Sequence, residues 1–238
     1  MDSMASNNPQ QAEPITFDNI QKCFVNRFGE EGDDTDQNIY DSFVPREAIL
    51  SLTESDRVRL TLDNALNRPQ DVQKLTQYVV SSAGRVFLTL IYSDAIEYIR
   101  DLQKAGFTDN DLPVYTKPSR DHSRVLIHRW RVNDTSPYAD KKHLPCFLNW
   151  SAAKLDGFFQ NQWIFLAPVF SQDKFAHVFY RKSRLPYVPT QGSDTSSGAG
   201  YFGMIRKRGL HNEHHKYQSL SKVIPSTPVP PRQSSNII

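Results

Sequence analysis

The stretch Arg85-Val-Phe-Leu-Thr-Leu-Ile-Tyr92 is the main evidence for the fold class of this 238-residue chain. It is a continuous run of β-branched, aliphatic and aromatic residues, and it is short for a helix. Runs of this length and composition favour a buried strand. We therefore expect an α+β fold, in which this strand lies among helices.

Apolar residues at three- and four-residue spacing surround this run and predict helices on both sides of it. Before the run, the period extends from Val44 to Gly84, and Ser51 and Glu54 have the spacing of a capping box. The apolar positions are Ile49, Leu50, Leu52, Val58, Leu60, Leu62, Leu66, Val72, Leu75, Tyr78 and Val79.

After the run, Asp94 with Glu97 predicts the start of another helix, and Gly106 stands where a left-handed C-cap would end it. A shorter helix is expected from Thr16 to about Gly29, with Phe17, Ile20, Phe24 and Phe28 on one face. Residues 16–106 are therefore expected to form a mainly helical region.

The rest of the chain divides by composition. Residues 1–14 are predicted to be a disordered leader and residues 225–238 a disordered, proline-rich tail. Residues 107–189 are predicted to be strands and loops, with strands at Arg124–Arg131, Gln162–Phe170 and Lys174–Tyr180. Pro186, Pro189 and the cluster Gln191–Ser197 are expected to form a flexible connector into the glycine-rich stretch that follows, within residues 190–224.

Composition excludes several classes of partner. The formal net charge is +2, from 28 basic and 26 acidic residues, so no strong field attracts nucleic acid. The arginines around Trp130 fit the exposed face of a strand better than a nucleic-acid surface. No segment has the roughly 18 apolar residues of a membrane helix. With only Cys23 and Cys146, the chain is expected in the cytoplasm or nucleus.

Gly198-Ala-Gly-Tyr-Phe-Gly-Met-Ile205 follows the pattern G-x-G-x-x-G-x-V, with Ile205 in the place of Val. Glycines at this spacing let backbone amides approach phosphate oxygens, because no Cβ intervenes. A flexible Gly/Ser linker is the alternative interpretation. A Rossmann loop fits less well because no helix follows, and a P-loop is excluded because no Gly-Lys-Ser/Thr follows.

The order of five segments resembles a fungal protein kinase family: Phe147–Trp150, Asn161–Pro168, Leu185–Tyr187, Gly198–Gly203 and His211–His215. The resemblance implies that residues 190–224 are a partial kinase N-lobe, containing its first two strands. It also implies that full-length relatives bind ATP and Mg²⁺ and phosphorylate Ser or Thr of proteins. The residues that would contact the nucleotide are Gly198, Gly200, Phe202, Gly203, Ile205 and Lys222.

Kinase chemistry also needs an H-R-D loop for the catalytic base and a D-F-G segment for magnesium, and neither occurs in these residues. We therefore expect a truncated, kinase-like chain that is catalytically incompetent and has no confidently assigned cofactor of its own. The alternative is a non-catalytic protein-interaction or regulatory module. His211, His214 and His215 lack the order of a zinc motif, and we interpret them as shaping a turn.

Overall fold

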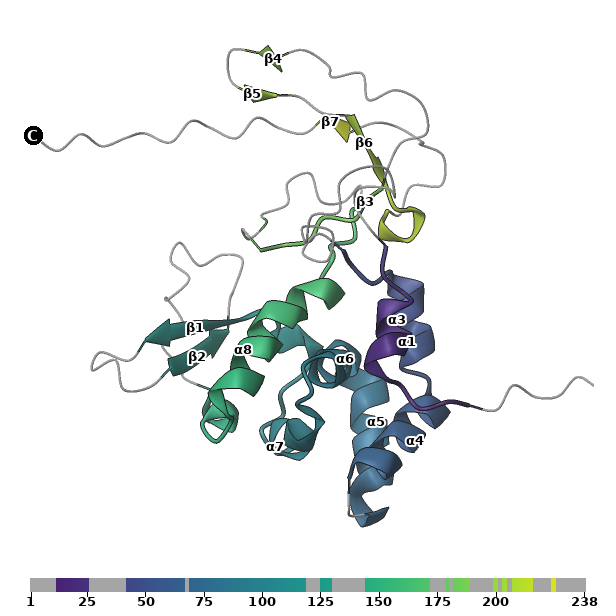
Figure 1. Cartoon of the computed structure of the whole chain (residues 1–238), viewed down its shortest axis with the longest axis vertical. Coiled ribbons are helices and arrows are strands. Elements are labelled where there is room, and N and C mark those ends of the chain that lie inside the picture. Colours follow the sequence, from purple (N-terminus) through teal and green to yellow (C-terminus); the bar gives the residue numbers. More distant parts are fainter. Residues whose placement is uncertain are drawn as a thin grey trace, which may run out of the picture. The chain divides into compact units, whose positions relative to one another are not determined.

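The computed structural model describes residues 12–25, 42–66, 69–118, 125–129, 144–171, 179, 182–188, 199–200, 203–204, 207–215 and 224–225 (Figure 1). The chain divides into two units. The helical unit comprises residues 1–23 and 46–166, and the strand unit comprises residues 24–45 and 167–238. Within the described part of the chain, no helix is both long and apolar enough to cross a membrane.

The helical unit contains seven α-helices and one β-hairpin among its described residues. The helices are α1 (Phe17–Gln21), α3 (Arg46–Leu52), α4 (Ser55–Ala65), α5 (Val72–Ser82), α6 (Gly84–Tyr92), α7 (Ile99–Lys104) and α8 (Ala152–Asn161). Strands β1 (Val114–Pro118) and β2 (Val125–Arg129) pair antiparallel. The predicted strand at Arg124–Arg131 is therefore present as β2. The chain is a mixed helix-and-strand protein, as the sequence predicts.

The prediction of a strand at Arg85–Tyr92 is wrong, because these residues form helix α6. Val86, Phe87, Leu88 and Leu90 are all fully buried. Helices α1, α3, α5 and α8 all contact α6, so it has no exposed polar face (Figure 1). Hydrophobic periodicity cannot separate a buried strand from a helix that is surrounded on every side.

Asp109 caps the start of α6 from a distant part of the sequence. Its carboxylate accepts the backbone N–H of Arg85 (3.1 Å) and of Val86 (3.0 Å). The first N–H groups of a helix have no partner within the helix, and this side chain supplies one. Burial raises the pKa of Asp109, although the backbone hydrogen bonds at Gly84, Arg85 and Val86 and the charge of Arg85 oppose the shift.

The ends of α6 and α7 have the same geometry. The prediction of a left-handed cap at Gly106 is confirmed, with a φ of 64°. There the N–H of Phe107 donates to Leu102 O and that of Gly106 donates to Gln103 O, both at 3.0 Å, which is a Schellman motif.

Asp94 takes the equivalent position after α6. Its φ is 49°, and the N–H of Ala95 donates to Leu90 O at 2.8 Å. The prediction that Asp94 starts the next helix is therefore wrong, because Asp94 ends α6. The next helical residues begin at Ile96 with a short 3-10 turn, which leads into α7.

The predicted strand at Gln162–Phe170 is also wrong. Gln162–Phe165 is a 3-10 turn that continues from α8, a helix that the sequence analysis did not predict. The buried side chain of Gln162 takes the place of a neighbouring strand. Its Oε1 accepts Val114 N–H (2.9 Å) and its Nε2 donates to Val114 O (3.0 Å). The apolar residues after Gln162 fill the core, which explains why their pattern looked like that of a buried strand.

Two smaller expectations near the start of the chain are corrected. Ser51 lies within α3, and α4 begins after Glu54 without a side-chain cap, so these two residues form no capping box. The first helix ends at Gln21, and Thr16 caps it together with Asn19.

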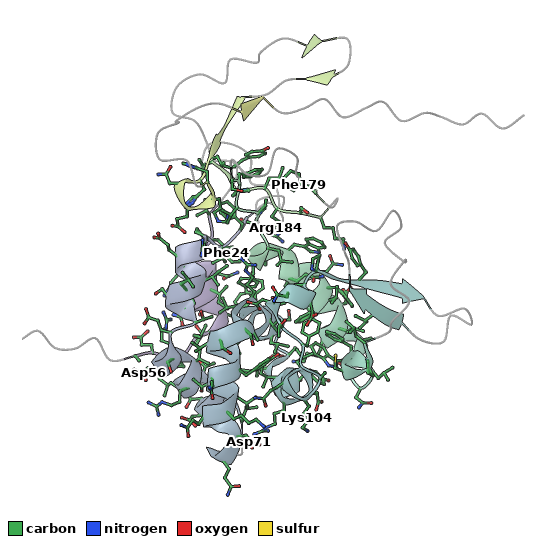
Figure 2. The ribbon with its side chains drawn as sticks, turned by 180° about the vertical axis from the view of Figure 1, so that it is seen from behind. Phe24, Asp56, Asp71, Lys104, Phe179 and Arg184 are labelled. Carbon is green, nitrogen blue, oxygen red and sulfur yellow. The ribbon has the colours of Figure 1, made fainter. Side chains whose placement is uncertain are left out.

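Charged residues such as Asp56, Asp71 and Lys104 lie on the outside of the helices (Figure 2).

Some expectations lie outside the described residues. These are the leader up to residue 11, the tail from residue 226, the connector 191–197 and the strand predicted at Lys174–Tyr180, of which only Phe179 is described. Of the predicted tail, Pro225 belongs to a strand.

Gly106→Ala is expected to lower the free energy of unfolding by about 1–2 kcal/mol, because an L-residue is strained at this φ. Nothing lies within 4 Å of the added Cβ, so backbone strain alone is tested. Gly157→Ala, within α8, is the matched control. Its Cβ would lie 3.5 Å from Ser93 Cβ, an ordinary contact, and we expect a gain of about 0.5–1 kcal/mol. Urea unfolding measures both changes, and equal signs for the two variants would contradict this account.

The raised pKa of Asp109 predicts a specific pH dependence of stability. A carboxyl group whose pKa is higher in the folded state than in the unfolded state stabilises the fold below its ordinary pKa of about 4. That stabilisation is lost as the pH rises through the folded-state value. Between about pH 3 and about pH 7, the unfolding free energy of the wild type should therefore fall relative to that of Asp109→Asn. A difference that is constant or that shifts the other way would show that the carboxylate is favoured in the fold.

Candidate functional site: the glycine hairpin

The glycine-rich sequence forms a hairpin in the strand unit. Strands β4 (Ala199–Gly200) and β5 (Gly203–Met204) pair antiparallel, with Gly200 opposite Gly203 and Ala199 opposite Met204. Only Tyr201 and Phe202 separate the two strands in the sequence. The pair that closes the turn therefore carries no Cβ on either strand, which leaves the backbone open to close approach.

A three-stranded antiparallel sheet belongs to the same unit. Strand β6 (Lys207–Leu210) is central and pairs with β3 (Tyr187–Val188) on one side and with β7 (Ile224–Pro225) on the other. Arg208 lies opposite Ile224. The sequence analysis expected only two strands around the glycine motif, so β7 corrects that expectation. The chain thus runs from β3 through the hairpin to β6 and then to β7.

The structure describes two of the six predicted nucleotide-contact residues. Gly200 and Gly203 are brought together as a cross-strand pair. Gly198, Phe202, Ile205 and Lys222 lie outside the described residues. Lys222 precedes Ile224 of β7 by two positions in the sequence.

A turn of histidines follows β6. Asn212–His214 is a 3-10 turn, and the N–H of His211 donates to Pro186 O at 2.9 Å. His214 Nδ1 lies within hydrogen-bonding distance, 2.9 Å, of Pro168 O, and His214 O accepts the N–H of Phe170 at 2.8 Å. In the described part of the chain, no three His, Cys, Asp or Glu side chains are placed to hold a metal ion.

The turn also contacts residues from the amino-terminal part of the chain. The ring of Phe43 meets the rings of His211 and His214 edge-on, with centroids 5.6 and 5.1 Å apart. The guanidinium of Arg184 donates to Ser42 O (Figure 2 labels Arg184). Sequence reasoning missed these partners because no local pattern relates positions so far apart; Ser42 and Arg184 are separated by 142 residues.

Glycine at both closing positions of the hairpin leaves no Cβ that would keep an anion away from the backbone there. Successive amides in a tight turn form a concave donor surface for phosphate, and glycine permits the approach.

Comparisons with protein-family models, with curated proteins and with solved structures found no match for this chain.

Proposed function

We propose that the strand unit contains the glycine hairpin of a protein-kinase-type nucleotide lobe, and that the hairpin contacts phosphate through its backbone amides. The cross-strand pair of Gly200 and Gly203 carries this proposal. It closes a turn of the kind that the kinase pattern requires, between antiparallel strands and without a Cβ at either closing position.

The succession of the strands along the chain supports the same proposal. In a kinase lobe the glycine loop joins two neighbouring antiparallel strands, and a third strand carries the lysine that binds the nucleotide phosphates. Here β6 follows the hairpin and pairs with both β3 and β7. Lys222 precedes β7 in the sequence and is the proposed counterpart of that lysine.

Contact between the hairpin and phosphate does not by itself make the chain a catalyst. ATP with Mg²⁺ is the ligand expected for full-length relatives in the fungal protein kinase family that the sequence resembles. These 238 residues contain neither an H-R-D nor a D-F-G sequence. Phosphoryl transfer depends mostly on positioning and on neutralising charge, which those segments supply in kinases. We therefore propose that this chain by itself is catalytically incompetent.

A non-catalytic protein-interaction or regulatory module is the second candidate. Leu50, Val80 and Leu148, all in the helical unit, are 59%, 50% and 49% exposed, respectively. Exposed apolar side chains can bind a partner, but single ones are common on monomers. This observation is weaker than the glycine pair, and it identifies no particular protein partner.

Titration with MgATP should shift the amide resonances of Gly200 and Gly203 in a heteronuclear NMR spectrum. We expect weak binding, with a Kd of about 1 mM or weaker, because phosphate contact alone does not offset the immobilisation of a nucleotide. Inorganic tripolyphosphate should act at the same amides. Gly200→Val should abolish the shifts, because its side chain would cover the turn.

Gly157→Ala, in the helical unit, is the control and should leave the titration unchanged. Absence of any shift at Gly200 and Gly203 with saturating tripolyphosphate would refute phosphate contact. Micromolar affinity for MgATP that is lost in Gly200→Val would refute the claim that these residues lack a complete nucleotide site.

The purified 238-residue chain is expected to show no phosphoryl transfer. The assay supplies labelled MgATP and a generic protein rich in Ser and Thr, and it follows the label on protein. Incorporation should equal that of a protein-free blank, since the base and magnesium ligands are not among these residues. Incorporation that depends on the chain and disappears in Gly200→Val would show that the chain is an active kinase.

A further inference from the structure

The contact between Phe43 and the histidine turn lies within the strand unit, although Phe43 comes from the amino-terminal part of the chain. The two imidazole rings meet the phenyl ring at 87° and 84°. Such edge-to-face contacts between aromatic rings are specific in geometry and favourable beyond the area that they bury. Arg184 holds the preceding carbonyl, that of Ser42, by a charge-assisted hydrogen bond.

Phe43 is joined to Val25, also from the amino-terminal part of the chain, by two backbone hydrogen bonds. Val25 N–H donates to Phe43 O at 2.9 Å, and Phe43 N–H donates to Val25 O at 3.2 Å. Residues 23 and 46, just outside the segment 24–45, both belong to the helical unit. The segment is therefore covalently attached at both ends, and its docking on the turn is an intramolecular event with a high effective concentration.

The turn beneath Phe43 is connected directly to the sheet. His211 follows Leu210, the last residue of β6, and its N–H is held by Pro186, the residue before β3. His214 ties the turn to Phe170 and Pro168. Whatever fixes this turn therefore fixes the carboxyl end of β6 against β3.

The sheet needs such support. Strands β3 and β7 are two residues long and β6 is four. A sheet of such short strands is stable in water only when one of its faces packs against other apolar side chains. Among the described residues of the strand unit, Phe43 supplies an aromatic side chain against the turn at the end of the central strand.

We propose that Phe43 is the positioning residue of the strand unit: together with Ser42, it docks on the His211–His214 turn and the adjoining Arg184 and holds β6 in place. The histidine turn binds an aromatic ring, and Arg184 binds the backbone carbonyl of the residue before it. In this chain, Phe43 and Ser42 supply those two groups. The packing of Phe43 on the turn does not depend on the proposed function. Only the role given to the sheet, which is to present the glycine hairpin, rests on that proposal.

Hydrogen exchange of the full chain, measured amide by amide, tests this proposal. In Phe43→Ala, the amides of Phe170 and His211 should exchange at least about tenfold faster, because removing a packed phenyl ring destabilises the elements that it touches. The amides of α6 should exchange at the wild-type rate. Phe43→Leu keeps the apolar bulk without the ring, so the imidazole proton shifts of His211 and His214 should still change. Leu50→Ala, at an exposed position of α3, is the control and should change none of these.

Unchanged exchange at Phe170 and His211 in Phe43→Ala would overturn the proposal. An increase in the exchange rates of the α6 amides by the same factor would also overturn it, because it would indicate that the whole chain unfolds more readily. A tripolyphosphate titration tests the link to the hairpin: the changes in the amide resonances of Gly200 and Gly203 should be smaller in Phe43→Ala than in the wild type. If the wild type shows no such shifts, the proposed phosphate contact fails, whereas the exchange rates still determine whether Phe43 holds the turn.

Discussion

A helix without a polar face is stable in water only when other segments cover it on every side, and α6 imposes this constraint on the helical unit. Full burial of each large apolar side chain contributes about 1.5–3 kcal/mol, and Val86, Phe87, Leu88 and Leu90 of α6 are all fully buried. A helix buried in this way must also satisfy its terminal backbone groups. Asp109 does this at one end, and the left-handed turn at Asp94 does it at the other.

The same requirement explains the polar residues inside the helical unit. Gln162 is almost fully buried and bonds both backbone groups of Val114, so the first residue of β1 is satisfied without another strand. The hydroxyl of Thr61 accepts the N–H of Ile15 at 2.8 Å and so fixes the residue before Thr16, the N-cap of α1. Buried polar groups are stabilising only when they are paired. Each of these residues lets a chain segment approach the core without an unsatisfied backbone group.

Much of the local structure could be predicted from the sequence, and its long-range partners could not. The apolar period gave α4 and α5, and the position of Gly106 predicted its left-handed cap, because both depend on neighbouring residues. The residues of α6 were assigned to a strand because a surrounded helix and a buried strand share the same composition. The spacing of Gly200 and Gly203 predicts a tight turn, and these two residues pair across the hairpin. Phe43 could not be found in this way, because its partners His211 and His214 lie far along the chain.

Helix α6 is the buried centre of the helical unit, where it contacts α1, α3, α5 and α8. Native-state hydrogen exchange of the amides from Leu88 to Tyr92, compared with unfolding of the chain by urea, tests this directly. The account predicts that these amides are among the slowest to exchange, and that their free energy of opening equals the global free energy of unfolding. Exchange through an opening of clearly lower free energy, with slower amides elsewhere in the helical unit, would contradict it.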